Sequence, residues 1–100
     1  MAAGSIAVQV KFMGDLPAVV GLRKLSLTLT EGNTVGDLLA CLSERYGDAF
    51  TDRVFSGPAK LHHTMVLFVD GEDIKRRGGF AATLRRGEVD VVMLPMFGGG

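Results

Sequence analysis

The chain has 100 residues, of which 47% are hydrophobic and one is a cysteine, which suits one domain with its own core and excludes an internal disulfide framework. Eleven basic and eleven acidic residues give a formal net charge of +0, so the basic footprint of a nucleic-acid-binding protein is missing. Residues 1–12 lack the pattern of a signal peptide and no stretch reaches the roughly 20 apolar residues of a membrane helix, so we expect a soluble cytoplasmic domain that binds neither nucleic acid nor membrane.

Two strands are predicted near the start of the chain. Apolar residues alternate with polar or small ones from Ile6 to Phe12 and again from Leu25 to Thr30, a period of two that is typical of strands with one buried face. The connection from Gly14 to Gly21 contains Pro17 and predicts the turn of a hairpin. The apolar residues within this connection indicate either a short helical turn or a partner contact.

After these strands, the spacing of the apolar residues changes from every second residue to the spacing of a helix. Thr34 is a good N-cap, and Asp37 follows it in the first turn, where negative charge suits the helix dipole. Apolar residues recur at helical spacing from Val35 to Tyr46, and Gly47 follows in the position where glycine often ends a helix. The sequence therefore predicts one amphipathic helix over Val35–Tyr46.

The second half of the chain predicts two further strands. Residues 48–64 carry the weakest pattern, whereas Met65–Val69 is a continuous apolar run of strand length. Residues 72–83 form a polar connection, and a β-branched run follows over Val89–Leu94 before Pro95. The order of strand, strand, helix, strand, strand predicts an α+β fold of the β-grasp type. We expect a mixed sheet of four to five strands with one main helix packed on one face.

The given sequence finishes on Gly98-Gly99-Gly100. Glycine loses more backbone freedom on ordering than any other residue, so three in a row do not serve stability. They suit a backbone that enters a channel too narrow for a Cβ atom. We therefore divide the chain into a β-grasp domain over residues 1–94 and a flexible tail over residues 95–100; the alternative is a frayed end without function.

Four motifs carry a resemblance to a known family. They are Thr34–Leu39 at the helix start, Val69–Ile74 and Leu84–Val89 at two turns, and Val92–Pro95 followed by the terminal glycines. In this order they resemble the MoaD/ThiS family of ubiquitin-like sulfur carriers, most closely the small subunit of molybdopterin synthase. The resemblance covers nearly the whole chain and places the family's glycine pair on Gly99 and Gly100.

The resemblance implies a carrier function rather than an enzyme. An ATP-using, ubiquitin-activating-type adenylating enzyme (MoeB/ThiF-like) would adenylate the carboxylate of Gly100, and a sulfur donor would displace AMP to leave a thiocarboxylate. The sulfur would then pass to a pyranopterin precursor on the large subunit of molybdopterin synthase (MoaE-like). Delivery for thiazole, cysteine or another metabolite, and protein modification through isopeptide bonds, are the alternatives. The chain itself would bind no metal or other cofactor.

The tail and the last strand supply the candidate contact residues. Pro95, Met96, Phe97, Gly98 and Gly99 would enter the partner ahead of Gly100. The strand Val89–Leu94 is apolar on both faces, which fits either a central strand or an exposed docking patch. We favour a patch. The residues expected to dock the partner are Val92, Leu94 and Phe97, with Arg85 and Arg86 at a basic rim that also includes Lys75, Arg76 and Arg77.

Overall fold

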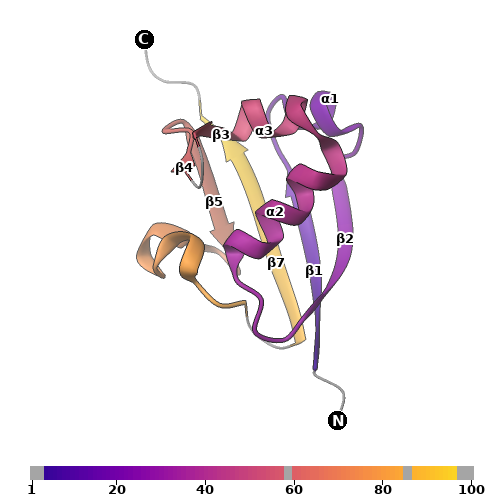
Figure 1. Ribbon diagram of the computed structural model, residues 1–100, viewed down its shortest axis with the longest axis vertical. Coiled ribbons are helices and arrows are strands. Elements are labelled where there is room, and N and C mark those ends of the chain that lie inside the picture. The colour runs from indigo at the N-terminus through magenta and orange to yellow at the C-terminus, as the bar shows by residue number, and fades with distance from the viewer. Residues whose placement is uncertain (1–3, 58–59, 85–86, 97–100) are drawn as a thin grey trace.

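The structure is a computed structural model that describes residues 4–57, 60–84 and 87–96. Its main sheet has five strands in the order β2-β1-β7-β5-β6, with helices packed on one face (Figure 1). The strands are β1 (Ser5–Phe12), β2 (Lys24–Thr30), β5 (Met65–Val69), β6 (Glu72–Asp73) and β7 (Gly87–Pro95). The predicted α+β, β-grasp architecture with a mixed five-stranded sheet is confirmed.

The first and last long strands form the centre of the sheet. β1 pairs with β7 in parallel, with Val8 opposite Val89 and Val10 opposite Val91, and all four side chains are buried. β2 flanks β1 and β5 flanks β7, both antiparallel. A parallel pair at the centre of a sheet is buried, which explains the concentration of valine in these two strands.

The predicted main helix is confirmed as α2 (Val35–Tyr46). The Thr34 side chain accepts a hydrogen bond from the Asp37 N–H at 3.2 Å, and the Asp37 carboxylate accepts one from the Thr34 N–H at 2.8 Å. This reciprocal capping box satisfies two amides that the first turn would leave unpaired. The bond from the Thr34 N–H lowers the pKa of Asp37 below its ordinary value.

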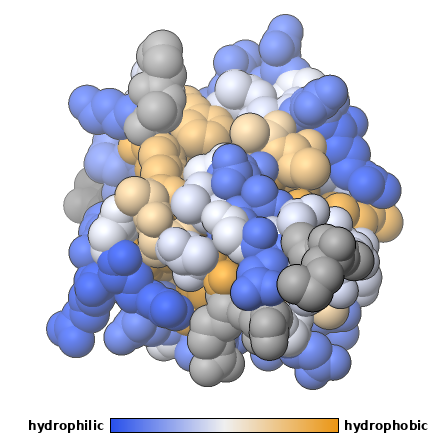
Figure 2. Space-filling model, turned by 60° about the horizontal axis from the view of Figure 1, so that its bottom comes forward, coloured by the Kyte–Doolittle hydropathy of each residue, from blue (hydrophilic) through white to orange (hydrophobic). Residues whose placement is uncertain are grey.

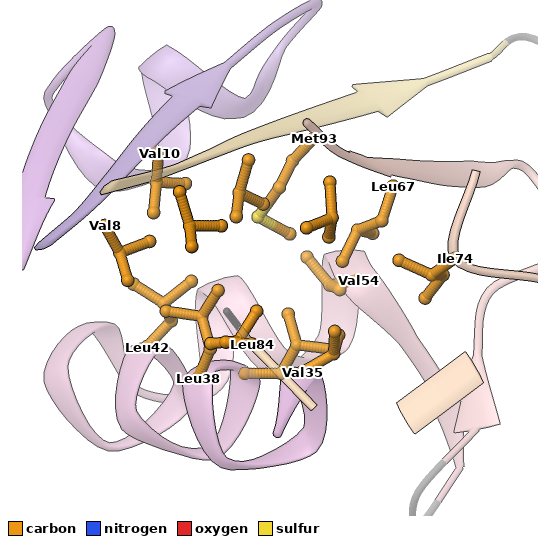
Figure 3. Packing of buried hydrophobic residues seen from close by; sticks show 14 of the residues in the cluster. Val8, Val10, Val35, Leu38, Leu42, Val54, Leu67, Ile74, Leu84 and Met93 are labelled. Carbon is orange, nitrogen blue, oxygen red and sulfur yellow. The ribbon is translucent and has the colours of Figure 1, made fainter. Parts of the chain in front are cut away.

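The core lies between the sheet and α2 (Figure 3). Leu38 and Leu42 of α2 point toward Val8 and Val10 of β1, and Met93 of β7 lies in the same layer. Each fully buried side chain of this kind contributes roughly 1.5–3 kcal/mol to folding. The domain therefore has its own core, and none of the helices formed by the described residues lies on the opposite face of the sheet (Figure 1).

The weakly patterned segments contain short elements that periodicity did not predict. Four of them are helical: α1 (Leu16–Val20), α3 (Asp48–Val54) and the 3-10 turns η1 (Ile74–Arg76) and η2 (Gly79–Ala81). α1 confirms the short helical turn expected within residues 14–21. Two short strands, β3 (Phe55–Gly57) and β4 (Lys60–Leu61), form a separate ribbon. α3 buries Phe50 and Val54. None of the helices in the described part of the chain is long and apolar enough to cross a membrane.

Candidate partner-binding surface

The tail leaves the sheet later than the sequence predicted. We placed its start at Pro95, but Pro95 is the last residue of β7, is buried and pairs with Met65. The next residue, Met96, donates its N–H to the Thr64 carbonyl at 2.6 Å, while 54% of its surface is exposed. Pro95 therefore belongs to the folded domain because it fills a position in the sheet. Phe97, Gly98, Gly99 and Gly100 lie outside the described residues.

A glycine holds the loop after β1 against this end of β7. Gly14 has φ +62°, a left-handed conformation that glycine adopts without strain, and a Cβ atom built on it would lie 2.8 Å from Cγ of Pro95. Met13 continues the contact by donating its N–H to the Met93 carbonyl at 3.0 Å. The β1–α1 loop and the root of the tail are therefore fixed to each other.

Four apolar side chains gather on the sheet face that α2 does not cover. Val92 and Leu94 of β7 alternate with the buried Val91 and Met93, as predicted, and are partly exposed. Val66 lies opposite Leu94, and Phe68 lies opposite Val92 on β5, both also partly exposed. We call Val66, Phe68, Val92 and Leu94 the sheet patch. It ends where the tail begins.

The rest of this face is polar. Lys11 of β1 lies beside Val92 in the parallel register, and the Ser26 hydroxyl donates to Oε1 of Gln9 at 3.0 Å. Glu88 and Asp90 occupy the exposed positions at the start of β7. Apolar surface on this face is thus concentrated on β5 and β7 near the tail, which is how an interface core with a polar rim is built.

The described part of the predicted basic rim lies away from the tail root. Lys75 and Arg76 form η1 after β6, and β5 and β7 are antiparallel, with Val69 opposite Val91 and Met65 opposite Pro95. η1 therefore follows the end of β5 that lies farthest from Pro95. Arg77 in addition pairs with Glu72 at 3.3 Å. Arg85 and Arg86 lie outside the described residues.

An apolar hollow lies on the side of the sheet that α2 covers. It has a volume of about 320 Å³ and is lined by Gly36, Leu39 and Ala40 of α2 together with Phe55 and Phe80. Figure 2 views the molecule mainly from the end at which the chain begins, and on this surface hydrophilic side chains separate the apolar areas from one another. This hollow is away from the uncovered sheet face, and we assign no partner to it.

The described residues offer no group of three or more His, Cys, Asp or Glu side chains that could hold a metal. His62 and His63 stack with ring centroids 4.8 Å apart rather than converging on one point. The sheet patch and the tail root, by contrast, are features suited to docking a partner.

Comparison with protein families decides the assignment. The model described as the ThiS family matches residues 10–100, which includes both the sheet patch and the terminal glycines. The chain belongs to the ThiS family.

Individual relatives of this ThiS-family chain agree with that assignment. The sulfur carrier protein CysO of Mycobacterium tuberculosis is 32% identical over 71 residues, which cover 69% of this chain and 74% of CysO. The crystal structure of SAMP1 from Haloferax volcanii is 26% identical, covers 97% of this chain and 100% of that one, and has a TM-score of 0.77. The Amycolatopsis orientalis BexX/CysO complex matches with 24% identity over 94% of this chain and 100% of that chain, with a TM-score of 0.73. The chain is thus a member of a ubiquitin-like sulfur carrier family.

Two parts of the candidate surface were missed by sequence reasoning. Val66 and Phe68 stand in an uninterrupted apolar run, so alternation could not show that one face of β5 is uncovered. Lys11 and Val92 are far apart in sequence and become neighbours only through the parallel β1–β7 register. A signal for Lys11 existed, because it falls on the polar side of a clearly alternating strand.

Proposed function

We propose that this ThiS-family chain carries sulfur as a thiocarboxylate on Gly100. Membership of a sulfur carrier family over residues 10–100 carries the proposal. A partner adenylating enzyme would join the Gly100 carboxylate to AMP and release pyrophosphate from ATP. A sulfur donor would then displace AMP, because adenylate is a good leaving group whereas the oxygen of a free carboxylate is not. The carrier contributes positioning and no acid, base or metal of its own.

The geometry of the tail root supports this role. Pro95 is held in the sheet and the Met96 N–H is bonded to Thr64, so the four residues beyond Met96 span at most about 13–14 Å. That length lets a carboxylate enter a site in a partner while the sheet patch lies against the partner's surface. Docking through the patch and delivery of the tail are thereby coupled in one binding event.

We propose a cytoplasmic pathway in which the acceptor is a small molecule. The likeness to CysO favours the cysteine alternative, and the motif resemblance at the helix start and turns favours molybdopterin synthesis on a molybdopterin synthase large subunit. The acceptor enzyme decides between these two, because the same carrier chemistry serves both.

Disrupting the gene tests the pathway. With CysO-type delivery, the mutant cells should require added cysteine, or lose a cysteine-dependent stress response, and should keep the activity of their molybdenum enzymes. Growth should be restored by the intact gene and not by a copy that lacks the codon for Gly100. Loss of molybdenum-enzyme activity with unchanged cysteine supply would instead favour molybdopterin synthesis and contradict delivery to cysteine.

Protein modification is the second candidate function. The likeness to SAMP1, described as a small archaeal modifier protein, favours it. The same adenylated glycine would then be attacked by a lysine amine to form an isopeptide. Proteins from the source cells that carry a remnant of this chain on lysine, seen after digestion by mass spectrometry, would support this function.

A further inference from the structure

A pocket of about 560 Å³ opens where β1 passes into α1 and β2 begins. Part of its lining is apolar, from Phe12, Met13, Pro17 and Ala18, and part is cationic, from Lys11, Arg23 and Lys24. We call these three cations the basic cluster. Neither the sheet patch nor the tail accounts for it.

The hairpin register brings the basic cluster together at a cost in stability. Lys11 and Lys24 are both exposed and lie directly opposite each other on β1 and β2. The Phe12 N–H donates to the Arg23 carbonyl at 2.9 Å, which places Arg23 next to this pair. Like charges directly opposite on neighbouring strands destabilise a sheet, so a bound anion would relieve a repulsion that the fold carries.

The described part of the chain supplies no counter-ion for the basic cluster. Its two salt bridges are Arg53–Asp15 and Arg77–Glu72. Asp15 is the nearby acid, but its carboxylate accepts a hydrogen bond from Nε of Arg53 at 2.9 Å. That bond lowers the pKa of Asp15, and the carboxylate is already paired with Arg53.

The pocket is joined to the surface that serves the tail. Gly14, which also lines the pocket, lies against Pro95 at the end of β7. Lys11 lies beside Val92 of the sheet patch. A partner that covers the sheet patch and receives the tail therefore reaches the basic cluster without a further movement.

We propose that the basic cluster binds an acidic segment of the partner that receives the tail. One or two carboxylates of that segment lie between Lys11, Lys24 and Arg23, and a neighbouring apolar side chain packs on the exposed Met13 and on Pro17. The apolar lining favours a peptide over a free anion. A formal net charge of +0, with Glu88 and Asp90 on the same sheet face, disfavours nucleic acid. The identity of the partner rests on the proposed function.

The variant Lys24→Glu tests the proposal because it should change stability and binding in opposite directions. It replaces a like-charged pair with an opposite-charged pair across from Lys11, so the melting temperature should stay the same or rise. Affinity for the adenylating enzyme of the same organism, measured by calorimetric titration, should fall about tenfold at low ionic strength. The difference from wild type should shrink in about 1 M salt, where the Debye length is about 3 Å.

Lys75→Glu is the matched control. Lys75 is an exposed lysine on η1, so the variant makes the same change in charge far from the tail and should bind like wild type. Equal losses for both variants would mean that net charge alone matters, and unchanged affinity for Lys24→Glu would mean that no acidic segment binds there; either result overturns the proposal. So does binding of a short DNA or RNA duplex that Lys24→Glu abolishes while enzyme binding is unchanged.

This titration requires no sulfur transfer, so its outcome is separate from that of the proposed function. If wild type binds the enzyme but never acquires sulfur, the proposed function fails and the contact can still be measured. If wild type acquires sulfur and Lys24→Glu binds normally, only the contact is wrong.

Discussion

Removal of Gly100, or the change Gly99→Val, should abolish ATP-dependent activation and leave the fold unchanged. A β-branched residue adds two methyl groups next to the reacting carboxylate, where the partner's channel is expected to admit backbone only. ATP–pyrophosphate exchange catalysed by the adenylating enzyme measures activation, and we expect the exchange rate to fall to background. The melting temperature should stay within error, because the described core ends at Pro95.

A lengthened tail provides the control for this prediction. One alanine inserted between Met96 and Phe97 keeps the terminal glycines and changes the reach from the Thr64–Met96 hydrogen bond by about 3.3–3.6 Å. Activation should then be reduced less than in Gly99→Val if the channel selects for small residues. Normal exchange with Gly99→Val would refute the channel, and a large fall in melting temperature would refute the separation of tail and fold.

The change Leu94→Asp should weaken binding to the partner by at least about 100-fold. Leu94 lies in the sheet patch opposite Val66, and burying a leucine is worth roughly 1.5–3 kcal/mol. The aspartate would also place an unpaired charge at a dry contact. Calorimetric titration against the adenylating enzyme measures the loss, with a thermal melt to confirm that the variant folds.

Thr28→Asp is the control on the same face of the sheet. Thr28 is exposed on β2, so the variant adds the same charge outside the sheet patch and should bind like wild type. Phe97→Ala should lower the affinity for the adenylating enzyme roughly 10- to 150-fold, which is equivalent to the burial of one large apolar side chain. If Leu94→Asp folds and binds normally, the sheet patch is not the docking surface. If it fails to fold, Val66→Asp on the neighbouring strand repeats the test.

The long elements of the fold could be predicted from sequence because their periods are unambiguous. Alternation gave the strands that begin at Ile6 and Leu25, and Thr34 with Asp37 marked the start of α2. The seven residues of α3 and the two or three residues of β4 and β3 are too short for a period to be read. Tertiary packing of Phe50 and Val54, rather than local propensity, determines that segment.

The candidate surface was only half predictable, because it depends on which strands are neighbours. Val92 and Leu94 could be assigned to the uncovered face from the strand itself, but Val66 and Phe68 join them only through the β5–β7 register. The position of the predicted basic region relative to the tail also depends on the register, because the antiparallel β5–β7 pair places η1, with Lys75, at the end of β5 that lies farthest from Pro95. Its role as a rim contact stays a prediction.

The mass of the intact protein purified from its own cells tests the central proposal most directly. If the chain is a thiocarboxylate carrier, part of the protein should be heavier than the form ending in the Gly100 carboxylate by the difference between one sulfur and one oxygen atom. An alkylating agent that reacts with thiols should modify this species at the C-terminus as well as at Cys41, while the carboxylate form is modified at Cys41 alone. Cells with an intact sulfur supply that yield only the carboxylate form, or a chain that continues beyond Gly100, would contradict the account.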